Sequence, residues 1–375
     1  MIRHLHVEGY RSIRNLRLEL GPLNVVLGPN GSGKTNLYRS LYLLAEAAQG
    51  RLARALADEG GMPSALWAGA RRKGLAAQVI IGATLDDFSY ELACGLPQVG
   101  SLMWEGHHKP SRFTLDPRVK RETATFLQGK RSTPLLERDN ATAWLRDGDG
   151  ARVTYPMALR DAESVLSQLQ DPQRYPVVAS LSAELRSWRF YHHFRTDLHA
   201  PLRHPQVGIQ TPVLSPDGTD LAAALQTIRE IGDGEALDEE VERAFPGARL
   251  EIDVRADEAR FAVQLAMPGI QRPLRAAELS DGTLRYLCLL AALLSPRPPT
   301  FLALNEPETS LHPDLIEPLA HLVARAAQSS QICLTTHAES LAATIAALTG
   351  RPAVHLSKVD GETRVAGPDP FSDDG

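Results

Sequence analysis

A glycine-rich segment between two regular elements constrains the fold of this chain more than any other feature. Residues 28–35 read GPNGSGKT, which fits the pattern GxxxxGK[ST]. The apolar residues 23–27 before the segment are typical of a buried strand, and apolar positions after it recur at helical spacing as far as Ala48. A strand, a glycine loop and a helix in this order predict an α/β domain that binds phosphate at the start of the helix.

The residue types in this loop suit contacts with phosphate and metal. Glycines allow backbone amides to point inward at phosphate oxygens, and a lysine carries positive charge to the outer phosphates. A hydroxyl at the end of the loop, that of Thr35, is expected to ligate magnesium. The residues expected to bind the phosphates are Asn30, Gly31, Ser32, Gly33, Lys34 and Thr35.

Three further groups lie in the C-terminal part of the chain. Ser280, Asp281 and Gly282 open a predicted helix, which directs free amides and the positive end of its dipole toward an anion. Glu306 follows an apolar strand, where a carboxylate can orient or deprotonate an attacking water. His337 follows another apolar strand and is expected to contact the terminal phosphate.

Each group has a plainer explanation when it is taken alone. Serine and aspartate are common N-caps, an acid after a strand is commonly a solvated loop residue, and a lone histidine is usually structural. The order of these groups along the chain favours a functional interpretation of all three.

Composition limits the classes of function. The 375 residues carry 40 basic and 45 acidic side chains, and a net charge of -5 argues against a protein that coats nucleic acid, so any DNA contact would be a local patch. Cys94, Cys288 and Cys333 are widely spaced, which favours buried free thiols. The start lacks an apolar signal core, and the longest apolar run, residues 286–294, is too short to span a bilayer. We therefore expect a cytoplasmic protein without membrane contact.

These motifs resemble the ATPase core of the ABC superfamily, and most closely its branch of RecF-like and SMC-like predicted AAA family ATPases. Lys34 and Thr35 match Walker A, Ser280 and Gly282 the signature loop, and Glu306 the carboxylate after Walker B. The remaining matches are the segment Tyr10, Arg11, Ser12 and Ile13, the D-loop Ser310, Leu311 and His312, and the switch histidine His337.

The resemblance implies an α/β fold: an ABC-type P-loop ATPase head with N-terminal antiparallel strands and a central, mostly parallel sheet flanked by helices. It also implies that ATP with Mg²⁺ induces a homodimer. Each ATP would lie between Walker A of one chain and the signature loop of the other, and Arg11 would touch the nucleotide. Residues 1–95 and 276–375 would form the two halves of the ATPase lobe, and residues 96–275 an inserted mixed, partly helical lobe.

Periodicity and turn residues predict the individual elements. Strands are expected at residues 2–7, 16–20, 23–27, 78–83, 88–93, 301–304 and 332–335, with a hairpin at 354–357 and 363–365. Helices are expected at residues 35–48, 161–169, 221–231, 280–294 and 313–327.

Two departures from the family pattern matter for activity. Asn305 stands where the family has the Walker B aspartate, so it would hold magnesium only indirectly, through water, and without a full charge. We therefore expect slow hydrolysis. The glutamine of the family's Q-loop has no clear counterpart, and Gln98 and Gln170 are weak candidates.

Two patches in residues 96–275 combine basic side chains with other features. Residues 188–195 interleave aromatic and basic groups as single-strand binders do, but a packed structural element with capping arginines is the favoured interpretation. Residues 109–131 are basic and are interpreted as a solvated helix face. His192, His193, His199 and His204 lack acids or cysteines at metal-ligand spacing, which argues against a metal site.

The leading hypothesis is an ATPase switch whose homodimer gates contact with DNA or with a separate effector protein, as in DNA repair, chromosome handling or phage defence. Only 38 residues follow His337, so we expect no nuclease domain of the overcoming-lysogenization-defect type. One alternative is the nucleotide-binding subunit of a membrane transporter, which the 245 residues between Lys34 and Ser280 disfavour. Another is a nucleotide-dependent scaffold with negligible hydrolysis, which Asn305 would explain.

Overall fold

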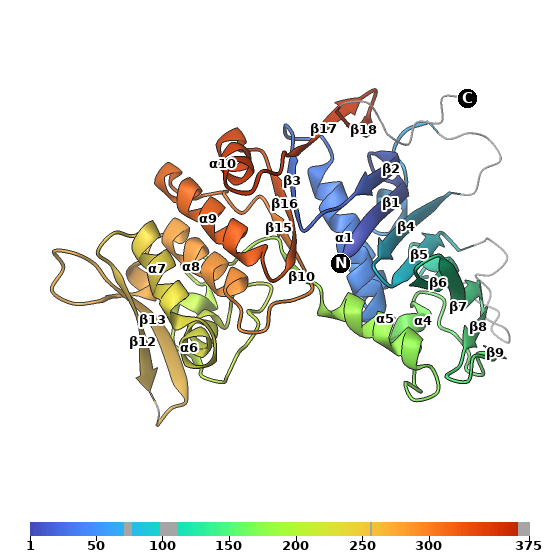
Figure 1. Cartoon of the computed structure of the whole chain (residues 1–375), viewed down its shortest axis with the longest axis horizontal. Coiled ribbons are helices and arrows are strands. Elements are labelled where there is room, and N and C mark those ends of the chain that lie inside the picture. Colours follow the sequence, from blue (N-terminus) through green and yellow to red (C-terminus); the bar gives the residue numbers. More distant parts are fainter. Residues whose placement is uncertain (71–76, 98–111, 256, 367–375) are drawn as a thin grey trace. The chain divides into compact units, whose positions relative to one another are not determined.

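The computed structural model describes residues 1–70, 77–97, 112–255 and 257–366, and it divides into two compact units (Figure 1). The first unit contains Met1–Gly21, Gly28–Trp188 and the C-terminal residues from His355, and the second contains Pro22–Leu27 and Arg189–Val354. These units follow long-range contacts and cross the boundaries of the three segments expected from sequence. The three-segment division stays a prediction.

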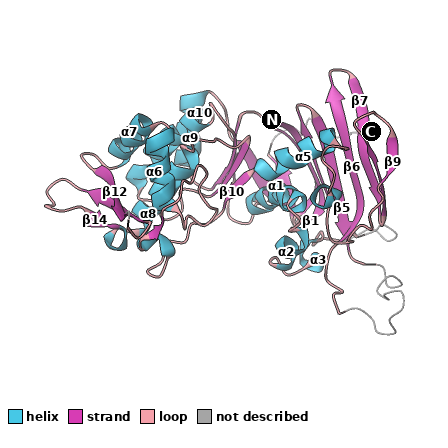
Figure 2. Cartoon of the chain, turned by 90° about the horizontal axis from the view of Figure 1, so that it is seen from below, coloured by secondary structure: helices cyan, strands magenta, loops and turns pink. Residues whose placement is uncertain are grey.

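An antiparallel sheet dominates the first unit, with the strand order β2-β1-β4-β5-β6-β7-β8-β9 in the described part of the chain. Its strands are β1 (Ile2–Tyr10), β2 (Ile13–Glu19), β4 (Gln78–Leu85), β5 (Phe88–Gly95), β6 (Arg118–Gln128), β7 (Arg131–Asp139), β8 (Thr142–Arg146) and β9 (Arg152–Thr154). Buried and exposed positions alternate along much of β6 and β8, as expected for strands with one covered face. Figure 2 shows α1 (Lys34–Ala48) and α5 (Pro176–Ser187) against this sheet. The shorter helices are α2 (Leu52–Ala57), α3 (Met62–Ala65) and α4 (Val165–Gln168).

Two predictions for the middle of the chain were wrong. The basic stretch expected as a solvated helix face contains β6, because its side chains alternate with period two and pair with β5 and β7. Its first residue, Lys109, lies outside the described residues. The helix expected at residues 161–169 is only the single turn α4, which follows the N-cap Ser164.

A buried polar group explains why the chain turns at α4. The Glu122 carboxylate of β6 accepts hydrogen bonds from the Ser164 hydroxyl at 2.6 Å and from the Val165 amide at 2.9 Å. Arg138 of β7 is equally buried and lies 3.9 Å from this carboxylate. Burial raises the pKa of Glu122, an effect that these hydrogen bonds and the Arg138 charge oppose. The start of α4 is thus held by the sheet and not by helix propensity.

A parallel sheet forms the centre of the second unit, with neighbouring strands in the order β10-β15-β16-β3. They are β10 (Arg189–Tyr191), β15 (Phe301–Asn305), β16 (Gln331–Thr336) and β3 (Leu23–Leu27). Every residue of β3, β15 and β16 is buried, as expected for parallel strands covered on both faces. The helices are α6 (Leu221–Ile231), α7 (Gly234–Ala244), α8 (Asp281–Leu293), α9 (Ile316–Ala326) and α10 (Glu339–Thr349).

Smaller elements complete both units. In the second unit, an antiparallel sheet contains β11 (Gln206–Val207), β12 (Arg249–Arg255), β13 (Arg260–Ala266) and β14 (Leu274–Arg275), and the 3-10 turns are η2 (Pro201–Arg203), η3 (Ala276–Glu278) and η4 (Pro313–Leu315). The C-terminal hairpin predicted from sequence is present as β17 (Val354–Val359) and β18 (Glu362–Val365). The expected α/β class, with N-terminal antiparallel strands and a parallel sheet flanked by helices, is confirmed.

The three cysteines are buried and free, as expected. Burial raises the pKa of the Cys94 and Cys333 thiols to about 12, which keeps them protonated and unreactive. Within the described residues, no helix has the length and apolar character needed to cross a bilayer.

Candidate functional site

The phosphate loop begins where the chain leaves β3, and its last two residues, Lys34 and Thr35, are the first two of α1. Gly31 and Gly33 have φ angles of +81° and +104°, which a side chain disfavours. Gly33 is the N-cap of α1 and supplies no capping side chain, and the start of such a helix is a favourable place for an anion. The buried Lys34 donates hydrogen bonds from Nζ to the carbonyl oxygens of Gly28 at 2.7 Å and Pro29 at 3.1 Å.

The C-terminal hairpin packs behind this loop. The Thr363 hydroxyl of β18 donates to the Ser32 carbonyl at 2.9 Å and lies 2.7 Å from the Ser12 hydroxyl, which accepts a hydrogen bond from Asn36 at 2.7 Å. A Cβ atom at Gly33 would lie 2.0 Å from the Thr363 Oγ1 atom. Neither Asn36 nor Thr363 belongs to a motif that the sequence alone identifies. Only Ser12 had a signal, through the resemblance.

Arg11 lies in an ion-pair cluster. Its guanidinium is 3.0 Å from the Glu59 carboxylate, which Arg39 also approaches to 3.4 Å. Tyr10 donates to the same carboxylate at 2.6 Å, and burial together with the Glu59 charge raises the pKa of Tyr10. The contact between Arg11 and nucleotide stays a prediction.

In the second unit, Ser280 is the N-cap of α8. Its hydroxyl accepts a hydrogen bond from the Thr283 amide at 3.1 Å. Gly282 packs against the D-loop, since a Cβ atom there would lie 2.8 Å from the Ser310 carbonyl oxygen. Ser280 therefore does act as an ordinary N-cap. The start of α8 also lies beside the D-loop, because Gly282 packs against Ser310.

The signature loop and the D-loop line one open groove of about 590 Å³. Its lining residues are Ala244, Phe245, Ser280, Gly282, Thr283, Ser310, Leu311, His312, Pro313, Asp314 and Leu315. The groove thus combines the positive end of the α8 dipole with hydroxyl groups and apolar side chains. Such a groove suits a ligand that has both an anionic group and an apolar part.

Glu306 and His337 lie together beyond the ends of neighbouring parallel strands. Glu306 follows β15, has a φ of +46° and donates its amide to the Thr335 carbonyl of β16 at 2.8 Å. The His337 Nδ1 atom is 3.8 Å from the Glu306 carboxylate. The Glu306 side chain is 27% exposed, so its carboxylate remains accessible to water. Each residue follows a buried strand, as the apolar pattern predicted.

Glu308 is a residue of this cluster that sequence reasoning missed. Its buried carboxylate accepts hydrogen bonds from the Thr336 hydroxyl at 2.5 Å and from the His337 amide at 3.1 Å, and lies 3.3 Å from the His337 Nδ1 atom. Glu308 therefore fixes the segment that carries His337. The available signal was a second acid two residues after Glu306 in the motif NEPE.

Arg285 of α8 approaches the same cluster. Its guanidinium donates to the Glu306 carbonyl at 3.2 Å. Burial lowers the pKa of Arg285, and the charge of Glu308 opposes that shift. The α8 helix is thereby tied to the backbone of Glu306.

Asn305 is buried, and its amide oxygen accepts a hydrogen bond from the Thr335 hydroxyl at 2.9 Å. An amide oxygen has two lone pairs, so one remains for a water bound to a metal ion. The exposed Thr35 hydroxyl is an oxygen donor of the kind magnesium prefers. Each of these side chains, within its own unit, offers an oxygen of a type that suits Mg²⁺, and neither supplies a negative charge.

Other sequence candidates lie away from these loops or outside the described residues. Trp188, Phe190, Tyr191 and Phe194 are buried, which confirms a packed element and leaves no aromatic face for base stacking. Gln170 is exposed after α4, and Gln98 lies outside the described residues. Among the side chains that the structure describes, no group of three or more His, Cys, Asp or Glu is arranged to hold a metal ion.

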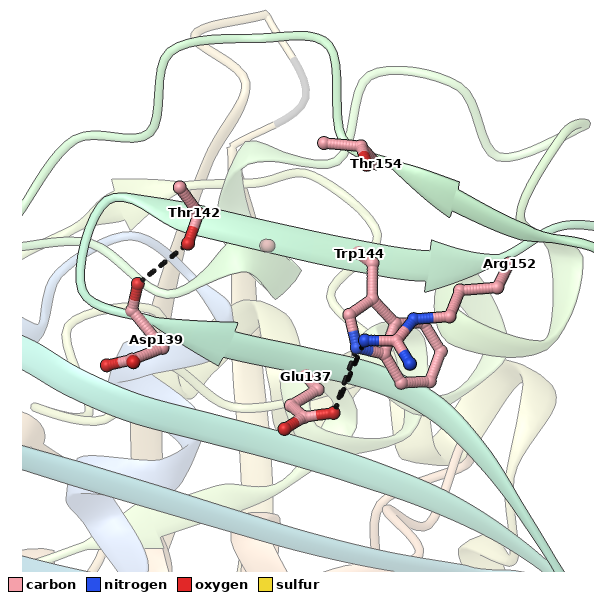
Figure 3. A pocket seen from close by; sticks show the side chains of 7 residues that line it. Glu137, Asp139, Thr142, Trp144, Arg152 and Thr154 are labelled. Carbon is pink, nitrogen blue, oxygen red and sulfur yellow. Dashed lines mark hydrogen bonds and ion pairs between the residues drawn. The ribbon is translucent and has the colours of Figure 1, made fainter.

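A separate hollow of about 450 Å³ lies on β7, β8 and β9 of the first unit (Figure 3). There the Arg152 guanidinium stacks 3.9 Å from the centre of the Trp144 ring, and the indole nitrogen donates to Glu137 at 2.9 Å. These side chains satisfy one another, and none belongs to a nucleotide motif.

Comparison with known proteins supports an ATPase of this type. A family model described as "AAA domain, putative AbiEii toxin, Type IV TA system" matches residues 109–343, and a second one, described as "AAA domain", matches residues 4–44. The OLD nuclease of Thermus scotoductus is 41% identical over 44 residues, which cover 12% of this chain and 8% of that protein. The chain therefore spans a small part of this curated relative.

Solved structures show the same fold over nearly the whole chain. An SMC head bound to the C-terminal winged-helix domain of ScpA superposes with a TM-score of 0.53 at 14% identity, covering 98% of both chains. An SMC head with an extended coiled coil, derived from Pyrococcus furiosus and bound to the C-terminal domain of ScpA, gives 0.51 at 14% identity, covering 97% of this chain and 95% of the other. The chain has the ATPase-head fold of SMC proteins, and its match over residues 109–343 shows that it belongs to the AAA domain family described as "putative AbiEii toxin, Type IV TA system".

Proposed function

We propose that this protein is an ATP-binding switch that hydrolyses ATP slowly and dimerises around two ATP molecules. The observation that carries the proposal is the groove in which the signature loop and the D-loop meet at the start of α8. In a monomer, the Ser280 hydroxyl caps the Thr283 amide of that helix start. In a dimer, the helix start would face the phosphates of an ATP bound by the second copy.

In this proposal, the residues of the chain divide the chemistry among them. Lys34 and the first-turn amides of α1 bind the phosphates, and Thr35 contributes a hydroxyl to Mg²⁺, which supplies charge neutralisation when bound. Glu306 orients the attacking water and accepts its proton. His337 donates a hydrogen bond toward the terminal phosphate from a position that Glu308 holds.

The proposed partners follow from the switch and not from a visible binding surface. The ATP-closed homodimer would gate contact with DNA or with a separate effector protein in the cytoplasm. The solved SMC heads are bound to ScpA domains, which supports a protein partner for the head fold.

The first test is the solution mass of Glu306→Gln with Mg²⁺ and ATP and again without nucleotide. Loss of the carboxylate should block hydrolysis and trap the closed state, so the mass should double with ATP. Multi-angle light scattering after size exclusion measures this directly.

A second substitution identifies the surface responsible. Ser280→Arg in the Glu306→Gln background places a long side chain at the exposed start of α8 and should abolish the doubling without loss of ATP binding. If Glu306→Gln stays monomeric with ATP at high protein concentration, the homodimer proposal is wrong.

The uncharged Asn305 supports a second candidate, a scaffold that binds ATP with negligible hydrolysis. Restoring a carboxylate by Asn305→Asp adds a charge near Mg²⁺, and we expect it to raise turnover about tenfold, since one full charge in a partly buried site contributes about 1 to 2 kcal/mol. Steady-state phosphate release measures this. Measurable turnover in the unmodified protein supports the switch, and turnover seen only in Asn305→Asp supports the scaffold.

A further inference from the structure

A buried arginine outside the known motifs holds the signature loop. Arg203 closes η2, and its side chain is 5% exposed. One terminal nitrogen lies 2.5 Å from the Asp281 carboxylate, and the other donates to the Leu279 carbonyl at 2.8 Å. That second nitrogen also approaches the carbonyls of Ala276 at 3.3 Å and Ala277 at 3.4 Å. The guanidinium thus contacts the backbone immediately before Ser280.

The same guanidinium also faces the segment that precedes it. The Arg203 Nε atom donates to the carbonyls of Thr196 at 2.9 Å and Asp197 at 3.1 Å. A single planar group therefore joins two stretches more than seventy residues apart in sequence. Guanidinium presents its five N–H donors in a rigid fork, which an ammonium cannot reproduce.

Hydrogen-bond geometry matters more than charge in this contact. The Asp281 side chain is 62% exposed, and an ion pair that is open to water contributes little. By contrast, the carbonyls of Ala276 and Leu279 meet the buried terminal nitrogen of Arg203. The position of the loop therefore depends mainly on the backbone carbonyls, and Asp281 adds a smaller share.

We propose that Arg203 is a positioning residue that sets the signature loop for the ATP bound by a second copy of this chain. This inference rests on the proposed switch function. Arg203 does not touch nucleotide in this proposal; it acts through the backbone of residues 276–281 and through Asp281 at the first turn of α8. In this proposal, Asp281 is the side-chain partner of Arg203.

The test compares dimer formation with nucleotide binding in the Glu306→Gln background. We expect Arg203→Lys to raise the dissociation constant of the ATP-dependent dimer about tenfold. Lysine has a single amino nitrogen and cannot reproduce the hydrogen bonds that the guanidinium makes in several directions. Asp281→Asn should weaken the dimer less, about two- to threefold, because an ion pair that is open to water contributes little energy. Sedimentation equilibrium at saturating Mg²⁺ and ATP gives the dimer constants. ATP affinity, measured with a fluorescent ATP analogue at protein concentrations where the chain is monomeric, should change less than twofold for both variants.

Arg272→Gln is the matched control, because Arg272 is an exposed arginine that pairs with Glu278 beside the same loop. It should leave the dimer constant unchanged. Arg203→Lys behaving like this control would overturn the positioning role while the switch stands. Equal losses of ATP affinity and dimerisation would also overturn it, since they indicate general misfolding. If the parent Glu306→Gln does not dimerise with ATP, the switch and this inference fail together.

Discussion

Replacing Glu306 by glutamine should lower ATP turnover by about 10²- to 10⁴-fold, the usual contribution of a positioned general base. The carboxylate stands at the carboxyl end of β15, partly open to water and 3.8 Å from the His337 ring nitrogen. Glutamine keeps the size of the side chain but cannot accept the proton of the attacking water. Affinity for ATP should stay within about twofold, because the proposed phosphate contacts come from other residues. Single-turnover and steady-state phosphate release measure the two effects separately.

Glu339→Gln provides the matched control for this change. Glu339 is exposed in the first turn of α10, two residues beyond His337, so its neutralisation tests the effect of local charge alone. Turnover should be unchanged in that variant. A similar loss in both variants, or near-normal turnover in Glu306→Gln, would remove Glu306 from the catalytic role.

The second large effect is expected from Gly33→Ala, which should destabilise the first unit by about 3 kcal/mol or more and abolish ATP binding. A left-handed backbone costs a side chain about 1 to 2 kcal/mol, and Gly33 has a φ of +104°. The added methyl would also meet Thr363 Oγ1 at 2.0 Å and Cγ2 at 2.7 Å. Relief of that clash must move either the phosphate loop or the hairpin.

Gly31→Ala separates the two contributions. Gly31 lies in the same loop with a φ of +81°, but a Cβ atom there would meet nothing within 4 Å. Its cost should be limited to about 1 to 2 kcal/mol of backbone strain. Urea denaturation gives both stabilities, and titration with a fluorescent ATP analogue gives the affinities.

A double variant then tests the hairpin contact itself. Thr363→Ala removes the two nearest atoms and leaves only a Cβ at 2.9 Å, so it should recover part of the stability that Gly33→Ala loses. Equal stabilities for Gly33→Ala and Gly31→Ala, or no recovery in the double variant, would mean that Thr363 does not constrain the loop.

Local sequence patterns predicted much of the framework. The strand at residues 23–27 and the helix at residues 221–231 have the predicted bounds, because a continuous apolar run and an apolar helical face are properties of neighbouring residues. The positions of Glu306 and His337 after buried strands also followed from pattern, and the parallel pairing of β15 with β16 then brings the two residues together.

Patterns failed where pairing joins distant segments. The basic residues of β6 were expected on a solvated helix face, yet they form a strand that pairs with β5. The residues of a strand do not identify the strands with which it pairs. In β6, the many basic side chains also obscured the alternation of apolar and polar residues that is typical of a strand. The length of α4 was overestimated for a similar reason. Its start is fixed by a hydrogen bond from the Val165 amide to the buried Glu122, which lies far away in the sequence.

The sequence by itself determined the identity and order of the candidate site groups: the phosphate loop, Ser280, Glu306 and His337 stand in recognisable local contexts. Only the tertiary structure decided what holds each of them in place. Thr363 closes on Gly33, Glu308 holds the backbone of His337, and Arg203 ties down the loop before Ser280. The physical reason is that a site residue must be of a particular type and must stand at a particular turn or strand end. A short sequence pattern is enough to identify both. A supporting contact needs only a hydrogen-bonding group or a side chain of suitable size at the right point in space. Folding can place such a residue there from any part of the chain.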